Sequence, residues 1–113
     1  MQYLVTAEWI DPMSNMPSAP KDFAQVLDQA VVPSMETLAK LTAEKTILAG
    51  GVLSGERAVA FVVEVSSNDE VTELVQSVPF WIFMKWNVTP LESFQHHGAF
   101  ASQASQSLNA ASQ

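Results

Sequence analysis

The 113-residue chain is 48% hydrophobic, which fits the size and composition of a single domain built around one core. Its formal net charge of -7 repels phosphate backbones and anionic membrane surfaces, so we expect neither nucleic acid nor a membrane as partner. The absence of cysteine excludes disulfides, thiolate metal sites and cysteine nucleophiles.

No segment has the pattern of a bilayer span or of a secretion signal. The longest apolar run, about Val78 to Met84, is interrupted by Pro79 and is far shorter than the roughly 18 residues that a span needs. The first residues have no basic region ahead of an apolar stretch. We therefore expect a soluble, cytoplasmic protein.

The segment from Tyr3 to Ile10 is predicted to form the first strand, because alternate residues form two sets that fit the two faces of an extended chain. Asp11 to Pro20 follows with three prolines, which lack backbone donors and fix φ, so we expect a loop long enough to act as a lid. The two faces of the strand separate its residues into two sets. One set is Tyr3, Val5, Ala7 and Trp9, and the other is Leu4, Thr6, Glu8 and Ile10.

Between Lys21 and Lys45, apolar residues recur mostly at steps of three and four, which predicts an amphipathic helix. Pro33 lies inside this pattern, where it removes a hydrogen bond and disfavours helical geometry at Val32. We expect a kink or a break there, with Ser34 as the N-cap of the second piece.

A hairpin is predicted next, with strands over Ile47 to Leu53 and Arg57 to Val65. The Gly50-Gly51 pair within its first strand predicts a bulge or a close backbone approach.

Ser67 and Glu70 have the spacing of a capping box at the start of a second helix, which Pro79 ends. Phe80 to Leu91 is predicted as the last strand. We assign residues 1–100 to the domain and expect residues 101–113, rich in Ala, Ser, Gln and Asn, to be a flexible tail.

This order of elements, βαββαβ, predicts an α+β fold of the ferredoxin-like kind. Right-handed crossovers place the four strands of an antiparallel sheet in the order four, one, three, two, with both helices on one face. The other face is left bare. Because a short chain gains stability when another subunit covers such a face, we expect a homodimer or a higher homo-oligomer.

One part of the chain resembles a known family. The run from Phe61 to Val71, followed by Leu74-Val75, Val78-Pro79-Phe80 and Val88-Thr89-Pro90-Leu91, is similar to the second half of the muconolactone isomerase family. In that family a strand leads through a Ser-Asn-Asp-Glu cap into a helix, a Leu-Pro turn and a strand that ends in Val-Thr-Pro-Leu.

The resemblance implies a dimeric α/β barrel, made by packing two bare sheet faces, with a pocket between sheets and helices. It also implies cofactor-free isomerisation of a small unsaturated lactone acid by proton transfer. Family members tend to carry a Trp-Arg pair and a further Arg before the central hairpin, whereas residues 46–53 here contain no Arg or Lys. This difference favours a more apolar or uncharged ligand.

Strand parity selects candidate catalytic residues on the bare face. Glu8 of the first strand and Glu64 of the third share that face, and Lys85 of the last strand is predicted to lie opposite Glu8. A carboxylate sheltered from water is shifted towards a pKa at which it exchanges protons near neutrality. A structural Glu8–Lys85 ion pair is the alternative, and it is the commoner arrangement.

Further residues are candidates for substrate binding. Large aromatic side chains line small-ligand pockets but also fill cores and interfaces. The binding candidates from these considerations are Thr6, Trp9, Trp81, Phe83 and Asn87.

His96 is a candidate acid or base at a pocket rim, with an exposed histidine as the alternative. Adjacent His96 and His97 point to opposite sides of an extended chain and are poor co-ligands, so no metal is expected.

Two classes of function therefore stand side by side. The first is a cofactor-independent proton-transfer isomerase that acts on a small, largely apolar metabolite. The second is a non-catalytic ligand-binding or assembly module in which dimer packing uses the whole bare face. A sheltered, convergent polar cluster distinguishes the first from the second.

Overall fold

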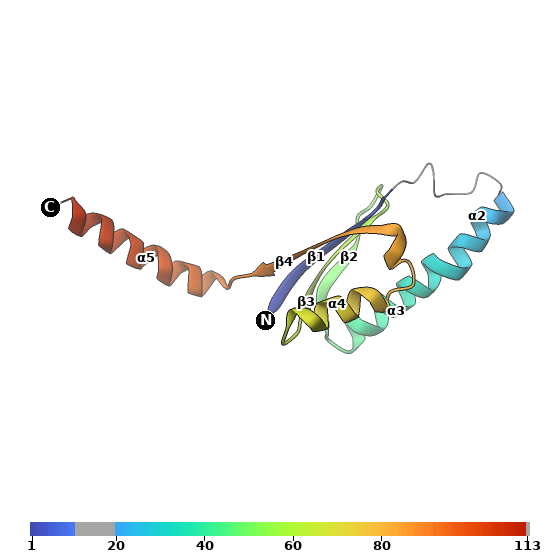
Figure 1. Cartoon of the computed structure of the whole chain (residues 1–113), viewed down its shortest axis with the longest axis horizontal. Helices are drawn as coiled ribbons and strands as arrows, with labels where there is room; N and C mark the ends of the chain where they lie inside the picture. The colour runs from blue at the N-terminus through green and yellow to red at the C-terminus, as the bar shows by residue number, and fades with distance from the viewer. Residues whose placement is uncertain (11–19, 113) are drawn as a thin grey trace.

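The computed structural model describes residues 1–10 and 20–112 (Figure 1). The predicted loop over Asp11 to Pro20 lies outside the described residues, apart from Pro20, which begins a helix. The strands are β1 (Gln2–Trp9), β2 (Ile47–Val52), β3 (Ala58–Glu64) and β4 (Met84–Leu91). The helical segments are α2 (Pro20–Val26), η1 (Leu27–Val31), α3 (Val32–Ala43), α4 (Asn68–Ser77), η2 (Trp81–Phe83) and α5 (Phe94–Ala111).

The four strands form one antiparallel sheet in the order β2-β3-β1-β4, which confirms the predicted order. The central strand β1 pairs with β3 on one side and with β4 on the other, so residues distant in the sequence share one sheet. This is the ferredoxin-like α+β fold.

The two faces of the sheet differ in burial, as the alternation predicted. Tyr3, Val5, Ala7 and Trp9 of β1 are buried, and Val59, Phe61 and Val63 of β3 continue the same apolar layer. Figure 1 shows α3 and α4 on one side of the sheet. Their apolar side chains, among them Val71 and Leu74 of α4, close the core on that side.

The opposite face, called the open face below, has no helical cover in the part of the chain that the structure describes. Leu4 is 36% exposed and Glu8 is exposed, while the alternate residues of β1 are buried. The bare face that the element order predicted is therefore present in the single chain.

The first helical region is continuous, with a π turn (η1) between α2 and α3. The Val32 amide donates to the Leu27 carbonyl, which is the five-residue spacing of a π turn. Pro33 follows in the first turn of α3, where a missing amide costs little. The chain therefore changes helix geometry before Pro33 without breaking.

The prediction that Ser34 caps the second helix was wrong. Ser34 lies inside α3 and is completely buried, and its hydroxyl donates to the Ala30 carbonyl and accepts from the Phe80 amide. The serine links α3 to the chain that enters β4. Its buried hydroxyl accepts a hydrogen bond from the Phe80 amide, which lies outside the helices and strands and needs such a partner.

The glycine pair in β2 has the predicted close approach and bulge. The register shifts between Ile47 and Ala49, and Gly50 has φ of 152°. A Cβ atom on Gly50 would lie 2.4 Å from the Cβ of Phe61. Only a residue without a side chain fits at this position.

Helix α4 starts at the predicted cap. The Ser67 hydroxyl accepts from the Glu70 amide. The Glu70 carboxylate accepts from the amide and hydroxyl of Ser66, one residue earlier than a capping box requires. These hydrogen bonds from Ser66 stabilise the charged form and lower the pKa of Glu70 below its ordinary value.

The segment expected to be a flexible tail, residues 101–113, is helical where the structure describes it. Residues 94–111 form α5, which the Ser93 hydroxyl caps by accepting from the His96 amide. The helix points away from the sheet, so that the chain as a whole extends over 72 Å along its longest axis (Figure 1). Ala, Gln and Ser permit helical geometry, and Gly98 is the one strong helix breaker after the cap.

Among the described helices, none combines the length and the apolar character required to cross a membrane.

We predict that Gly50→Ala lowers the free energy of unfolding by at least about 2 kcal/mol, because it adds a clash at a positive φ. The matched control is Gly51→Ala, where a new Cβ meets nothing within 4 Å. Urea unfolding of the two variants measures the difference. Equal free energies of unfolding for the two variants would show that the structure accommodates a Cβ atom next to Phe61 without loss of stability.

Candidate functional site

An apolar cavity of about 180 Å³ lies between the first helical region and the hairpin end of the sheet. Its walls come from α2, η1 and α3 on one side and from all four strands or their ends on the other. The lining residues are Trp9, Phe23, Leu27, Val31, Met35, Val52, Glu56, Arg57, Ala58, Val59, Phe80 and Met84. We call this cavity the helix–sheet pocket.

The helical wall of the helix–sheet pocket is one row of side chains. Phe23, Leu27, Val31 and Met35 follow each other at four-residue steps. In an α-helix, four residues overshoot a full turn by about 40°, so such a row drifts around the axis. The wider π turn over Leu27–Val31 rotates each residue less, which offsets the drift and keeps the row facing the sheet.

Trp9 is the large aromatic residue that β1 contributes to the pocket wall. The side chain is 8% exposed and stacks on Phe83, with ring centroids 5.6 Å apart and planes 11° apart. Its indole Nε1 is buried without a hydrogen-bond partner among the described residues. A buried N–H without an acceptor costs free energy, so a ligand oxygen that accepts from it gains correspondingly.

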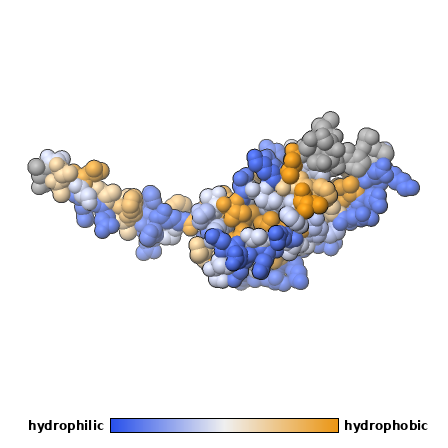
Figure 2. Space-filling model, viewed as in Figure 1, coloured by the Kyte–Doolittle hydropathy of each residue, from blue (hydrophilic) through white to orange (hydrophobic). Residues whose placement is uncertain are grey.

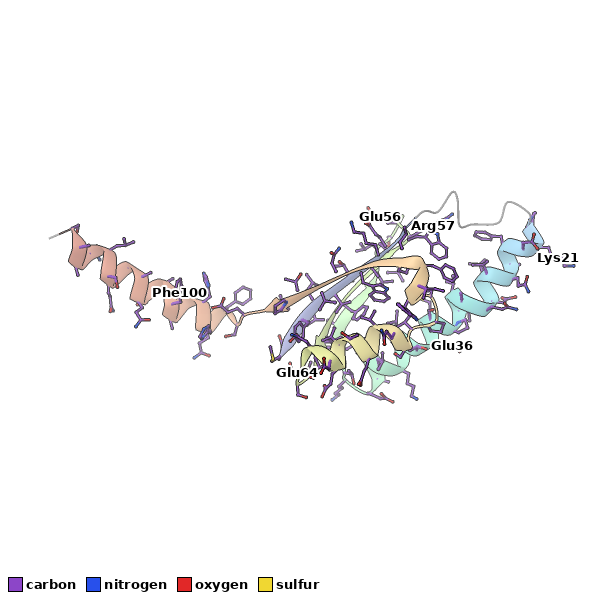
Figure 3. The ribbon with its side chains drawn as sticks, viewed as in Figure 1. Lys21, Glu36, Glu56, Arg57, Glu64 and Phe100 are labelled. Carbon is purple, nitrogen blue, oxygen red and sulfur yellow. The ribbon has the colours of Figure 1, made fainter. Side chains whose placement is uncertain are left out.

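The mouth of the helix–sheet pocket is charged. Glu56 and Arg57 come from the turn between β2 and β3 and lie at the same end of the sheet (Figure 3). A shallow surface depression next to them is lined by Glu8, Trp9 and Ala58 together with the same two residues. The mouth therefore has a carboxylate and a guanidinium beside an apolar interior, and a second carboxylate, that of Glu8, lies in the adjoining depression.

The structure brings some predicted site residues together. Glu8 pairs with Lys85 across the β1–β4 ladder, and Thr6 pairs with Asn87 two residues further on. All four lie on the open face, as the parity predicted. Glu8, Lys85 and Asn87 are exposed in the single chain, and Thr6 is half-buried.

Glu64 lies away from this group. It pairs with Gln2, whereas Glu8 pairs with Ala58. Six residues of strand therefore separate the two carboxylates, roughly 20 Å. Glu64 instead forms an ion pair with the amino terminus at 3.2 Å (Figure 3 shows it at the far end of the sheet).

His96 also lies apart, in the first turn of α5 rather than on extended chain. Its Nε2 lies 3.6 Å from Glu92, and Nδ1 of His97 lies 3.5 Å from the same carboxylate. Within residues 1–10 and 20–112, no group of three or more His, Asp or Glu side chains is placed to hold a metal ion.

Trp81 and Phe83, two of the predicted binding candidates, do not lie with the acidic candidates. Trp81 starts the 3-10 segment η2 and lines a hollow beside α4, and Phe83 stacks on Trp9 on the helix side of the sheet. The acidic candidates point to the open face instead. The last strand was expected to begin at Phe80, but residues 81–83 form a 3-10 turn. Side chains in such a turn do not alternate between the two faces of the sheet, which explains the different positions.

Several residues of the helix–sheet pocket were not selected from the sequence. Arg57, which is exposed, Phe80 and the helical row were not among the candidates. The four-residue repeat from Phe23 to Met35 is the signal that identifies the row. Nothing in the sequence indicated that a π turn would keep it aligned.

The fold and the pocket define the class of protein. This is a ferredoxin-like α+β domain with an apolar cavity between its sheet and its first helix. A family model described as muconolactone delta-isomerase matches residues 1–97. The chain belongs to this family.

Solved structures support the fold. A muconolactone isomerase structure aligns with a TM-score of 0.65 and 19% identity, over 82% of this chain and 90% of that one. The second is 5-chloro-2-hydroxyhydroquinone dehydrochlorinase from Burkholderia phenoliruptrix AC1100 in complex with 2,5-dihydroxybenzoquinone. It aligns with a TM-score of 0.59 and 19% identity, over 85% of this chain and 98% of that one. No curated protein matches the chain.

The Ser34 hydroxyl anchors Phe80, which lines the pocket, so Ser34→Ala leaves a buried amide without an acceptor. We predict a loss of about 1–3 kcal/mol in the free energy of unfolding. The control is Thr42→Ala, which removes an exposed hydroxyl that donates within the same helix and changes stability by less than about 0.5 kcal/mol. Thermal and urea unfolding measure both, and similar losses would contradict the anchoring role.

Proposed function

We propose that the protein is a cofactor-independent isomerase that transfers a proton on a small, largely apolar metabolite bound in the helix–sheet pocket. Membership of the muconolactone delta-isomerase family supports the reaction class. The single observation that carries the choice of site is that Trp9, whose buried indole N–H has no hydrogen-bond partner among the described residues, lines a largely apolar cavity.

The Trp9 indole suits the electrostatic need of such a reaction. Removing a proton next to a carbonyl group places negative charge on the carbonyl oxygen. A fixed donor in a site with little water stabilises that charge without reorganising. In this proposal Trp9 binds the substrate oxygen, and stacking on Phe83 holds its ring in place.

Carboxylates at the mouth are the proposed proton carriers. Glu56 lines the helix–sheet pocket itself, and Glu8 lies in the adjoining depression with Arg57. Arg57 can pair with a carboxylate on the substrate, which replaces the arginines that the segment before the hairpin lacks. Lys85, across from Glu8 in the sheet, is its proposed electrostatic partner.

We further propose that two copies pack through their open faces as a homodimer. That face exposes Leu4 together with the Glu8–Lys85 and Thr6–Asn87 pairs. Covering it removes water from around Glu8 and encloses the Glu8–Lys85 pair between the two copies. Family membership supports self-association in general.

A binding module without turnover is the second candidate. The observation in its favour is that Glu8 and Glu56 are exposed at the mouth while the interior walls are apolar. Activity of the carboxylate variants described below distinguishes the two.

We predict that Trp9→Phe weakens binding of an oxygen-bearing ligand about tenfold, because it removes the donor and keeps the stacked ring. Calorimetry with muconolactone and with 2,5-dihydroxybenzoquinone as probes measures the change. Trp86→Phe is the control, since its indole already donates to the Trp81 carbonyl at 2.9 Å. Unchanged affinity in Trp9→Phe would remove the indole from the site.

We predict that Glu8→Gln or Glu56→Gln lowers kcat by about 10²–10⁴-fold for any compound that the protein isomerises, muconolactone being tested first. Glu64→Gln is the matched control at the other end of the open face and keeps full activity. Proton exchange followed by NMR in deuterated water measures the transfer step. Full activity in both mouth variants would leave the proposal without a base.

A further inference from the structure

The edge strand β4 is left partly uncovered on the helix side of the sheet. Trp86, Val88 and Pro90 of β4 pair with three buried residues of β1, and residues that pair across an antiparallel ladder point to the same face. Val88 is nevertheless 42% exposed, and Pro90 is exposed as well. The helices therefore cover the centre of the sheet and leave its β4 edge open on this side.

A hollow of about 570 Å³ lies between this edge and α4. Figure 2 shows apolar residues between these two elements. The hollow shares no lining residue with the helix–sheet pocket, and it lies on the side of the sheet opposite the open face. The lining residues are Tyr3, Asn68, Val71, Thr72, Val75, Gln76, Trp81, Trp86, Val88 and Pro90. We call it the α4–β4 hollow.

One wall of the α4–β4 hollow is a row of polar, uncharged side chains. Asn68, Thr72 and Gln76 follow each other at four-residue steps along α4, which places them about 6 Å apart on neighbouring turns. Val71 and Val75, which are buried, lie beside this row and form an apolar floor. The wall therefore offers hydrogen-bonding groups over roughly 12 Å above an apolar surface.

The polar row contains both donors and acceptors. The Asn68 Oδ1 accepts from the Tyr3 hydroxyl, which leaves the amide NH₂ group of Asn68 as a donor. The Thr72 hydroxyl donates to the Asn68 carbonyl at 3.3 Å, which leaves the hydroxyl oxygen as an acceptor. The Gln76 amide carries one group of each kind. A ligand with several hydroxyl groups along one edge matches this row, because each hydroxyl both donates and accepts.

The opposite wall is aromatic and apolar. Trp81 is 38% exposed at the rim. Two contacts hold Trp86: its indole Nε1 donates to the Trp81 carbonyl at 2.9 Å, and its ring meets that of Phe61 edge-on, with centroids 6.5 Å apart. Val88 and Pro90 continue the wall along β4. A ligand ring with a flat apolar face therefore has an aromatic surface to stack on.

The charge of the lining selects a neutral ligand. None of the lining residues is Asp, Glu, Lys or Arg. A charged ligand would lose hydration there without gaining a counter-charge, and the net charge of -7 also repels anions. A simple phenol is neutral, but its one or two hydroxyl groups reach only part of a row roughly 12 Å long. Sugars combine the required features, since a pyranose ring has an apolar C–H face and hydroxyl groups around its edge.

We propose that the α4–β4 hollow binds a neutral saccharide of at least two rings. One ring stacks on Trp81, and hydroxyl groups of the linked rings form hydrogen bonds with Asn68, Thr72 and Gln76. This site is separate from the helix–sheet pocket and does not depend on the isomerase activity proposed above. Packing of two copies through their open faces leaves it accessible, because it lies on the other side of the sheet.

Titration of the full chain with maltose, cellobiose and lactose tests the proposal. Tryptophan fluorescence and saturation-transfer NMR measure binding, and the NMR signals show which sugar protons lie against the protein. We expect at least one of the three disaccharides to bind with a Kd below about 10 mM. If none of them does, the proposal is overturned.

Two substitutions locate the bound sugar. Gln76→Ala removes a hydrogen-bonding group and weakens binding about five- to tenfold. Trp81→Leu removes the stacking ring, keeps the backbone carbonyl to which Trp86 donates, and weakens binding about tenfold. Gln103→Ala, which removes an exposed glutamine from α5, is the matched control for Gln76→Ala and keeps the original affinity. Equal affinities in all three variants contradict the assignment of the sugar to the hollow.

Two further results overturn the proposal. Trp9→Phe changes the helix–sheet pocket and no residue of the α4–β4 hollow, so loss of sugar binding in this variant places the sugar in the other cavity. Resorcinol tests a phenol as ligand, and tighter binding of resorcinol than of each disaccharide, abolished by Trp81→Leu, assigns the hollow to a single aromatic ring. Because Gln76 is exposed, its variant keeps the test decisive even where Trp81→Leu does not fold.

Discussion

The alternation of side chains along β1 is the constraint on which the rest of the structure depends. Its odd-numbered residues are buried beneath the helices, and its even-numbered residues form the open face. Trp9 at one end of the buried row lines the helix–sheet pocket, and Tyr3 at the other end lines a hollow between α4 and β4. Because β1 pairs with both β3 and β4, a register error of one residue would exchange core and surface across the sheet.

The pocket results from how the first helical region accommodates Pro33. A helix broken at the proline would direct Phe23 and Met35 to different sides. The π turn instead keeps them in one row above the sheet, and the buried Ser34 hydroxyl holds the row against the chain that leads into β4. The π turn therefore accommodates Pro33 within a continuous helix and also shapes the cavity.

The molecule has two kinds of uncovered apolar surface, which have different consequences. The open face carries Glu8 and Lys85, so covering it changes the electrostatics near the pocket mouth. The helix α5 and the hollow between α4 and β4 contain no Asp, Glu, Lys or Arg, so covering either of them would contribute mainly apolar burial.

Three features were predictable from the sequence because they depend on local chemistry and on periodicity. They are the pairing of the strands, the cap of α4 and the close approach of the backbone at Gly50. Ser67, Gly50 and the Glu8–Lys85 pair are examples. The burial of Ser34, the burial of the Trp9 indole and the position of Arg57 depend on which segments meet in three dimensions. No local pattern contains that information, because each of these environments is completed by residues from distant parts of the chain.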